Sequence, residues 1–307
     1  MRLSSSKHSF VGQRLRWLLA LSVFSFSGAL VASDAKQSTT LYVDFPVKDF
    51  EQGSETTLHH TEYGLLKILI PELRKQYPVS LAQSNSGQAV ALVQREQAGC
   101  VSNVRFTQAR SNKLHFSKPF SLYFGMRLYY QADNVKAQSA IAKFGRKPVA
   151  LAKLFEGEQS GRLGVVSGRS YGDKIDPFLN SPEMRYNLYV RGANDMSKGL
   201  LAMLGQGRVD YVIEYPEVAA HYLDDHQEEN IRSVALAESE SMVTGHLACA
   251  KTAEGKAVIA EFDTLVANYQ QREDYYQAHI AGLPESLRAE FAKQYEHVFG
   301  KVAENGR

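Results

Sequence analysis

Strand-like and helical runs alternate along most of this 307-residue chain, and this alternation limits the folds that it can adopt. Short apolar runs at 40–45, 100–104 and 162–166 are typical of buried strands. Segments between them, such as 63–76 and 197–206, carry apolar residues at helical spacing. Strands that alternate with helices favour an α/β fold with a mainly parallel sheet.

The same succession of strands and helices occurs twice, which indicates two α/β units followed by helices. Further strands are expected at 78–82, 122–130, 207–215 and 245–251, and further helices at 87–97, 149–156, from 173, 258–269 and 283–299. Pro71 should kink or shorten the helix at 63–76, because proline lacks a backbone donor and clashes with the preceding turn.

The N-terminus predicts an export signal. Four basic residues precede an apolar run at 17–32, namely Arg2, Lys7, Arg14 and Arg16. A membrane anchor is the alternative, but a spanning helix needs about 20 apolar residues, and this run is shorter and broken by serines and a glycine. We expect cleavage after Ser33 or Ala35 and a periplasmic mature protein.

Loss of this leader changes the charge of the chain. Residues 1–33 hold four of the 35 basic residues and none of the 33 acidic ones, so 31 basic and 33 acidic residues remain, a formal charge of −2. A nearly neutral surface does not favour nucleic acid as a partner. What remains is long enough for two domains of about 100 to 200 residues each.

The two cysteines of the chain, Cys100 and Cys249, lie too far apart for a CxxC redox motif or a zinc knuckle. Disulfides persist in exported proteins, so a disulfide between them is favoured over two separate buried thiols. Such a bond would join distant parts of the chain.

Arg110 is the leading candidate for a ligand contact. It lies just ahead of a short apolar run that Pro119 closes, as expected for an arginine held at the end of a strand. A guanidinium keeps its charge and offers five donors in a rigid fork, which suits a ligand carboxylate. The alternative is an arginine in an exposed loop.

Three segments occur in a fixed order after the leader, at 107–120, 164–170 and 207–215. With them the chain resembles the periplasmic, or extracellular, solute-binding proteins of family 3, the polar amino-acid-binding type, over essentially the whole mature length. The resemblance implies a type II periplasmic-binding-protein-like fold, with two α/β lobes joined by a hinge. It implies a leader at 1–35, a first lobe from 36–125 plus 252–307, and a second lobe from 126–251.

The resemblance also implies a binding site between the lobes, where Arg110 grips a ligand carboxylate and a glycine-serine loop at a helix start closes on it. The residues implied are Arg110, Ser102, Asn103, Arg105, Gly168, Arg169, Ser170, Tyr171 and Tyr215. The amides and dipole of a helix N-terminus favour an anion at such a loop. Ser170 could instead cap a helix, and either tyrosine could be a core residue.

One position departs from the pattern of the family. Members that bind α-amino acids usually carry an aspartate where this chain has Tyr215. Glu214 should point to the opposite face of its strand, and Asp210 should lie at the start of that strand. Because Arg105 and Arg169 add positive charge, we hypothesise a ligand with several acidic groups or without an amine.

We therefore expect a monomeric periplasmic protein that captures a small carboxylate-bearing solute for an ABC permease or a membrane sensor. No catalysis and no cofactor are expected. A metal site formed by His59, His60 and Glu62 is disfavoured, because adjacent histidines on a polar loop rarely converge on one ion. The alternatives are an exported enzyme of the cyclohexadienyl dehydratase type, with Glu214 or Asp210 as general acid, and an orphan binding protein for signalling.

Overall fold

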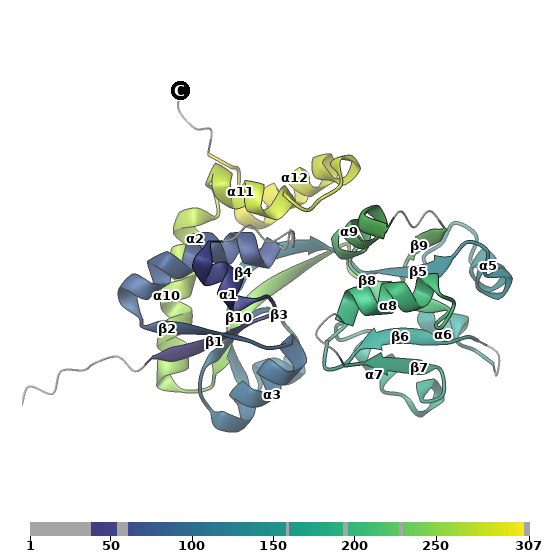
Figure 1. The fold of residues 1–307 in the computed structure, drawn as a ribbon, viewed down its shortest axis with the longest axis horizontal. Coiled ribbons are helices and arrows are strands. Elements are labelled where there is room, and N and C mark those ends of the chain that lie inside the picture. The colour runs from purple at the N-terminus through teal and green to yellow at the C-terminus, as the bar shows by residue number, and fades with distance from the viewer. Residues whose placement is uncertain (1–37, 54–60, 158–159, 193–195, 227–229, 304–307) are drawn as a thin grey trace, which may run out of the picture. The chain divides into compact units, whose positions relative to one another are not determined.

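The computed structural model describes residues 38–53, 61–157, 160–192, 196–226 and 230–303. The predicted leader and its cleavage sites lie outside these residues. The described chain forms two five-stranded sheets with helices packed against them (Figure 1), which confirms the predicted two-lobed α/β fold.

The first sheet combines parallel and antiparallel strands. Its strands, in spatial order, are β2 (Val79–Gln83), β1 (Thr39–Val43), β3 (Cys100–Arg105), β10 (Met242–Ala250) and β4 (Leu114–Phe124). β1 pairs in parallel with β2 and β3, whereas β10 runs antiparallel between β3 and β4. The buried residues of β1 alternate with partly exposed ones, as the period of a strand requires.

Seven helices accompany this sheet within the described residues. They are α1 (Val47–Gln52), α2 (Thr61–Gln76), α3 (Ser86–Glu96), α4 (Gln108–Ser111), α10 (Ala253–Tyr269), α11 (Glu273–Ile280) and α12 (Glu285–Phe299). α2 continues past Pro71 to Gln76, so the proline does not shorten it. Ile70 and Leu73 beside the proline are buried in the core, and this packing outweighs the local preference.

The second sheet has the same arrangement. Its strands, in spatial order, are β7 (Leu188–Arg191), β6 (Leu163–Val166), β8 (Tyr211–Glu214), β5 (Arg127–Gln131) and β9 (Ile231–Ala235). The helices are α5 (Val135–Ala142), α6 (Leu151–Leu154), α7 (Asp176–Leu179), α8 (Met196–Gly205) and α9 (Pro216–His226), with a 3-10 turn at Pro182–Met184. β6 and β8 are buried along their whole length, as expected of strands covered on both faces.

Two chain segments cross between the sheets, one from β4 to β5 and the other, which contains Glu240, from β9 to β10. The run at 122–130, predicted as one strand, is divided at Gly125 into β4 and β5. The Gly125 amide donates to Ser241 O (2.8 Å), and a Cβ atom at Gly125 would lie 1.6 Å from Glu240 O, so this close crossing requires glycine. β10 pairs within the first sheet, whereas the predicted boundary placed residues 126–251 in the second lobe.

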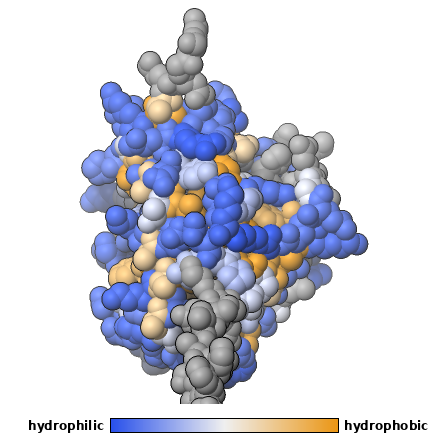
Figure 2. All heavy atoms as spheres, turned by 90° about the vertical axis from the view of Figure 1, so that its left-hand side faces the viewer, coloured by the Kyte–Doolittle hydropathy of each residue, from blue (hydrophilic) through white to orange (hydrophobic). Residues whose placement is uncertain are grey.

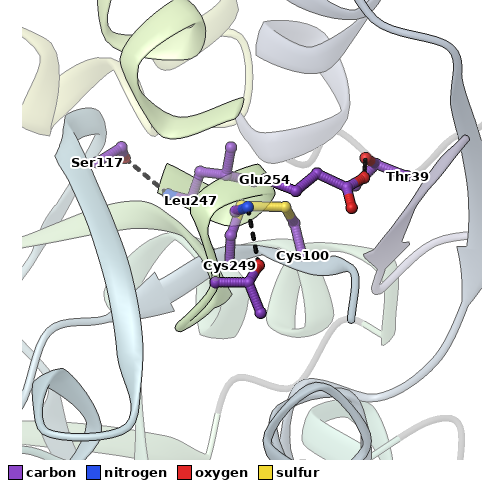
Figure 3. Close-up of a disulfide and its surroundings, with 8 residues drawn as sticks. Thr39, Cys100, Ser117, Leu247, Cys249 and Glu254 are labelled. Atoms are coloured by element: carbon purple, nitrogen blue, oxygen red, sulfur yellow. Dashed lines mark hydrogen bonds between the residues drawn. A yellow bond between two sulfur atoms is a disulfide. The ribbon is translucent and has the colours of Figure 1, made fainter. Parts of the chain in front are cut away.

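The predicted disulfide is present and joins two neighbouring strands of the first sheet (Figure 3). Cys100 of β3 and Cys249 of β10 are direct cross-strand partners, although 149 residues separate them in the sequence. Thr39 and Glu254 are hydrogen bonded nearby (2.8 Å). The bond therefore fixes the return of the chain to the first sheet.

Apolar side chains are mostly gathered in the cores. Hydrophilic residues predominate on the face shown in Figure 2, and apolar residues occur there in small groups. In the described part of the chain, no helix has both the length and the apolar character needed to cross a bilayer.

Candidate functional site

A cavity of about 420 Å³ is lined by residues of both lobes, a size within the usual range of small-ligand pockets. The first lobe contributes Asp44, Glu62, Ser102, Asn103, Arg105, Arg110 and Tyr123, among others. The second contributes Arg169, Ser170, Ser197, Lys198, Tyr215, Glu217, His221 and Asp225. Seven of the nine predicted site residues are in this lining, and Gly168 and Tyr171 are not.

Arg110 lies on a single helical turn, and not at the end of a strand as predicted. Thr107 caps this turn by accepting the Arg110 amide (3.2 Å), which directs the arginine back toward β3. Its guanidinium donates to Arg105 O (3.2 Å) and Gly168 O (3.4 Å) and forms no ion pair with a described carboxylate. Burial lowers the pKa of Arg110, because the charged form loses solvation. Most of its donors thus remain available to a ligand.

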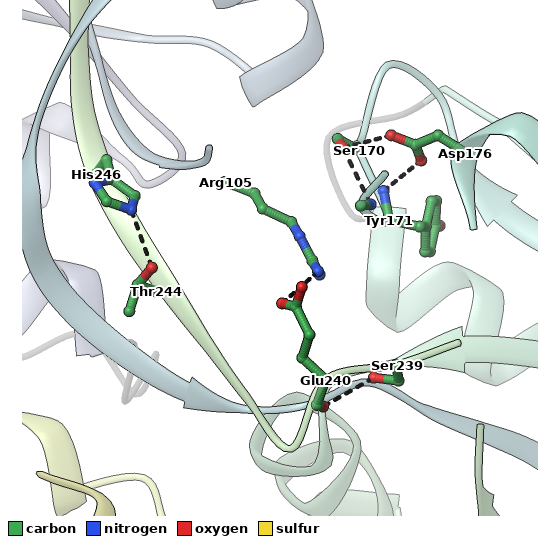
Figure 4. Close-up of polar contacts among 9 residues, drawn as sticks. Arg105, Ser170, Tyr171, Asp176, Ser239, Glu240, Thr244 and His246 are labelled. Atoms are coloured by element: carbon green, nitrogen blue, oxygen red, sulfur yellow. Dashed lines mark hydrogen bonds and ion pairs between the residues drawn. The ribbon is translucent and has the colours of Figure 1, made fainter. Parts of the chain in front are cut away.

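The other two arginines of the cavity are already paired. Arg169 donates from Nη1 to both carboxylate oxygens of Glu214 (2.8 Å each) and from Nη2 to Ser197 Oγ (2.8 Å). Burial opposes the charged form of Arg169, but the Glu214 carboxylate outweighs it and raises the arginine pKa. Arg105 pairs with Glu240 in the crossing segment (2.8 Å; Figure 4). Neither arginine offers a free charge.

The two acids considered for catalysis, Glu214 and Asp210, are not among the lining residues, and each has a structural partner. Glu214 is fully buried and belongs to the ion pair with Arg169. Asp210 accepts Asn134 Nδ2 (2.8 Å) and the Arg162 amide (2.7 Å) at the start of β8. Both carboxyl groups are thus engaged by the protein itself in this structure.

The donors of the glycine-serine loop are hydrogen bonded to a carboxylate of the same chain, that of Asp176. Ser170 Oγ donates to Asp176 Oδ2 (2.5 Å), and the Tyr171 amide donates to Asp176 Oδ1 (2.6 Å; Figure 4). The following helix, α7, begins only at Asp176 and has four residues, so Ser170 is not at a helix start, contrary to the prediction. These loop donors are therefore used internally.

Gly168 contributes an acceptor and a close backbone contact. Its carbonyl oxygen accepts a hydrogen bond from Arg110 Nη2, and its φ of +71° lies in the left-handed region that favours glycine. A Cβ atom on Gly87 of α3 would lie 2.6 Å from Gly168 Cα. The two lobes thus meet backbone to backbone beside the cavity.

The two predicted tyrosines have different places. Tyr171 is buried in the second-lobe core, where its hydroxyl accepts the Val166 amide (2.7 Å). Tyr215 lines the cavity, and its ring lies 5.6 Å from that of Tyr123 across the lobes. Only Tyr215 can contact a ligand directly in this arrangement.

Asn103 has a strained but firmly held backbone. Its φ is 51°, which is uncommon for a residue other than glycine. Its amide donates to Tyr123 Oη (2.8 Å) and accepts from Ser121 Oγ (2.8 Å). Strained residues held in this way cluster at functional sites.

Buried acids are the main feature that the sequence analysis missed. Glu62 and Glu217 line the cavity, and each is only 7% exposed. Burial raises the pKa of Glu62 to about 7 and that of Glu217 to about 8. Burial also raises the pKa of Asp44 to about 6, although solvent reaches this side chain within the cleft.

Ser102 explains how Glu62 is held. Its Oγ is hydrogen bonded both to the Glu62 carboxyl and to Tyr42 O (3.2 Å). A hydroxyl has one proton, so both bonds form together when Glu62 is protonated and donates. His59 and His60, which were considered with Glu62 for a metal, lie outside the described residues.

No family model and no curated protein matches the chain. Solved structures match its fold at low identity. A histidine kinase sensor domain with similarity to periplasmic binding proteins has 12% identity and a TM-score of 0.54, over 87% of this chain and 96% of that one. The substrate-binding protein of an amino acid ABC transporter has 14% identity and a TM-score of 0.56, over 80% and 99%.

A third structure is an ancestral amino acid-binding protein described as a precursor of cyclohexadienyl dehydratase. It has 15% identity and a TM-score of 0.56, over 80% of this chain and 96% of that chain. The three matches span most of each chain, and they agree with the paired sheets described above. The chain therefore has the two-lobed α/β fold of type II periplasmic binding proteins.

Proposed function

We propose that this chain is a periplasmic solute-binding protein that captures a small carboxylate-bearing ligand between its two lobes. Ligand contacts from both lobes would favour the state in which the lobes are closed. The protein would act as a monomer, without catalysis, after export and removal of residues 1–35.

Arg110 is the observation that carries this proposal. It is a cavity arginine that donates only to backbone carbonyls among the described residues, and most of its donors are unused. Arg105 and Arg169 are paired with glutamates, so Arg110 is the arginine of the described lining whose charge no described carboxylate pairs. Tyr123 and Tyr215 add aromatic surface, as is common in ligand pockets.

A thermal-shift screen with the protein purified after export tests the proposal. A carboxylate ligand at a hundredfold excess over its Kd should stabilise the protein by about 2.7 kcal/mol. Arg110→Ala should remove this response, whereas Arg95→Ala, at an exposed position outside the cavity lining, should keep it. An unchanged response in Arg110→Ala contradicts the assignment.

The partner is proposed from the structural matches. One match belongs to an amino acid ABC transporter and another to a histidine kinase. We propose that the closed form is recognised by a membrane permease or by a membrane sensor. Co-purification of the exported protein with either class of membrane protein, in the presence of ligand, distinguishes the two.

An exported dehydratase is the second candidate. Glu62 and Glu217 favour it, because burial raises the pKa of both carboxyls so that each can hold a proton at neutral pH. One structural match is a precursor of cyclohexadienyl dehydratase. Turnover of prephenate by the purified protein, abolished in Glu62→Gln or Glu217→Gln, would favour this enzyme over a binding protein.

A further inference from the structure

Arg105 is a cavity arginine to which the proposed binding function gives no role. It is the last residue of β3, and its charge is already paired with Glu240. The side chain of Arg105 is only 12% exposed, whereas that of Glu240 is 56% exposed. The ion pair alone therefore does not account for the burial of the arginine.

The second lobe makes a close contact with the Arg105 guanidinium. Gly172 lies in the loop between β6 and α7, and a Cβ atom there would lie 2.4 Å from Arg105 Nη2, 2.6 Å from Cζ and 2.9 Å from Nε. Apart from the chain neighbours of Gly172, these are the three heavy atoms nearest to that position. The φ of Gly172 is +102°, so both its backbone and this contact require glycine.

The segment between β9 and β10 holds the same guanidinium from the hinge. Arg105 Nη2 donates to Glu240 Oε2 (2.8 Å; Figure 4). The carbonyl of Glu240 packs against Gly125 in the other crossing segment. Arg105 thus joins its own lobe, the two crossing segments and a loop of the second lobe.

Arg105 also adjoins the arginine that is proposed to bind the ligand. Arg110 donates from Nη1 to Arg105 O (3.2 Å) and from Nη2 to Gly168 O (3.4 Å), in the same second-lobe loop. Burial raises the pKa of Tyr215 to about 12, against the charges of Arg169 and Arg105, so Arg105 lies within electrostatic range of this cavity phenol. The end of β3 and the second-lobe loop therefore meet at both arginines.

The bridge formed by Arg105 should be stronger when the lobes are closed. Separation of the lobes takes Gly172 away from Arg105 and lets water reach the guanidinium. An ion pair surrounded by water contributes little, whereas a partly shielded pair is stronger because the local dielectric constant is lower. Glu240 remains 56% exposed beside Arg105, so its carboxylate loses only part of its hydration in the closed form.

We propose that Arg105 is a positioning residue for ligand capture, whose guanidinium, held by Glu240, receives the second-lobe loop at Gly172 and stabilises the closed lobes. This inference rests on the proposed function, in which Arg110 binds the ligand carboxylate. It differs from the sequence-based prediction that Arg105 contacts the ligand. A ligand on Arg110 gains from Arg105 because closure is favoured, and not through a direct bond.

Gly172→Ala tests the contact without any ligand. Its Cβ atom overlaps the Arg105 guanidinium, so the lobes should move apart. Small-angle scattering of the ligand-free protein, purified after export, should give a larger radius of gyration. Gly157→Ala is the matched control and should keep the wild-type radius. Gly157 has the same φ of +102°, and no described atom beyond its chain neighbours lies within 4 Å of its Cβ position.

Two further measurements separate the contact from backbone strain. Gly172→Ala and Gly157→Ala should lower the free energy of unfolding by similar amounts in urea, because both place alanine at the same φ. In an Arg105→Ala background, Gly172→Ala should not increase the radius of gyration further, because the guanidinium that it overlaps is gone.

Ligand affinity gives an independent readout. The probes are glutarate, 3-phenylpropionate and glutamate, titrated calorimetrically. For the probe that the wild type binds most tightly, Arg105→Ala and Gly172→Ala should each weaken binding about tenfold, and the double variant should bind no more weakly than Arg105→Ala. Glu240→Gln should weaken binding roughly threefold, because Arg105 keeps its contact with Gly172 but loses an exposed ion pair.

The outcomes separate the inference from the proposed function. If Gly172→Ala scatters like Gly157→Ala, or if the two losses of affinity add in the double variant, Arg105 does not act through Gly172. The inference is then wrong, and the proposed function stands. If no probe binds, or if Arg110→Ala leaves all binding intact, the proposed function fails, and a role of Arg105 in ligand capture fails with it.

Discussion

The two sheets have the same strand order, but each is stabilised by a different kind of bond. In the first sheet, β3 is joined to β10 by the disulfide between Cys100 and Cys249. In the second sheet, the corresponding strand β8 ends in Glu214, which is paired with Arg169. One topology is thus secured covalently in one lobe and electrostatically in the other, so redox and charge changes should affect the lobes differently.

The two lobes also differ in whether the polar groups beside the cavity are already paired within the protein. On the second lobe, Arg169 and the Ser170 loop are satisfied by Glu214 and Asp176. On the first lobe, Arg110 has only backbone acceptors. A lobe that satisfies its own polar groups can be rigid without ligand, whereas an unpaired arginine gains most when a ligand arrives.

Loss of the disulfide should have the largest effect on stability. Replacing both Cys100 and Cys249 by serine should lower the free energy of unfolding by about 4 kcal/mol, because a long loop in the unfolded chain is no longer closed. Urea denaturation followed by circular dichroism measures the change. Hydrogen exchange should show lost protection in β3 and β10 but not in β6 and β8. Equal loss in both sheets would contradict the comparison of the lobes.

Glu214→Gln should cost about 3 kcal/mol, because it leaves the buried Arg169 without its counter-charge. Glu240→Gln is the matched control: Glu240 is 56% exposed, so loss of its ion pair with Arg105 should cost less than about 1 kcal/mol. Chemical denaturation compares them.

Replacing both members of the buried pair, as in Arg169→Met with Glu214→Leu, should recover most of the loss from Glu214→Gln. A double variant no more stable than Glu214→Gln would mean that packing, and not the unpaired charge, causes the effect.

The stability of the ligand-free protein should depend on pH through Glu62. Its pKa is about 7 in the folded protein against 4.5 for the ordinary group. A raised carboxyl pKa gives stability that is fully present below pH 4.5 and is lost as pH rises through 7. We expect Glu62 to contribute a loss of about 2 kcal/mol between pH 5 and pH 8, measured by thermal denaturation. Asp44 and Glu217, whose pKa values burial also raises, add losses of the same sign.

Glu62→Gln should remove the Glu62 share of this pH profile and leave the shares of Asp44 and Glu217. His279, in the first-lobe core, acts in the opposite direction, because burial lowers its pKa to about 4 and stability falls as pH drops from 6.5 toward 4. His279→Gln should therefore change only the acidic limb. A profile unaltered by Glu62→Gln would show that this carboxyl is not the group that titrates.

The contact between the lobes should give the smallest effect. Gly87→Ala places a Cβ atom 2.6 Å from Gly168 Cα, which must push the lobes apart. Fold stability should change little, because alanine favours the helix α3 by up to about 1 kcal/mol. Ligand affinity should fall roughly tenfold, about 1.4 kcal/mol, and small-angle scattering should give a larger radius of gyration.

Gly192→Ala is the control for this variant, since its Cβ atom would meet Ser167 at an ordinary 3.4 Å. We expect a larger radius of gyration for Gly87→Ala and no change for Gly192→Ala. Identical scattering by the two variants would mean that the Gly87 contact does not hold the lobes together.

The alternation of strands and helices determined the fold class, because the periods of two and 3.6 are local properties of the sequence. Most elements lie within a few residues of their predicted bounds, such as α2 and β6. The division at Gly125 was missed, since it is set by the approach of Glu240 from a distant segment. The helix α9, with Glu217, was also not anticipated, although Pro216 after a buried strand is a typical start of a helix.

The sequence by itself determined the candidate residues of the site, because arginines and glycine-containing loops can be recognised from their neighbours. The tertiary structure decided which of these residues are already paired with another side chain. Arg169 meets Glu214 across 45 residues, and Glu62 meets Ser102 across 40. Charge pairing and burial depend on what the fold brings together, so only the folded chain shows that, among the described residues, no carboxylate pairs with Arg110 and no hydrogen-bond partner reaches Glu217 Oε2.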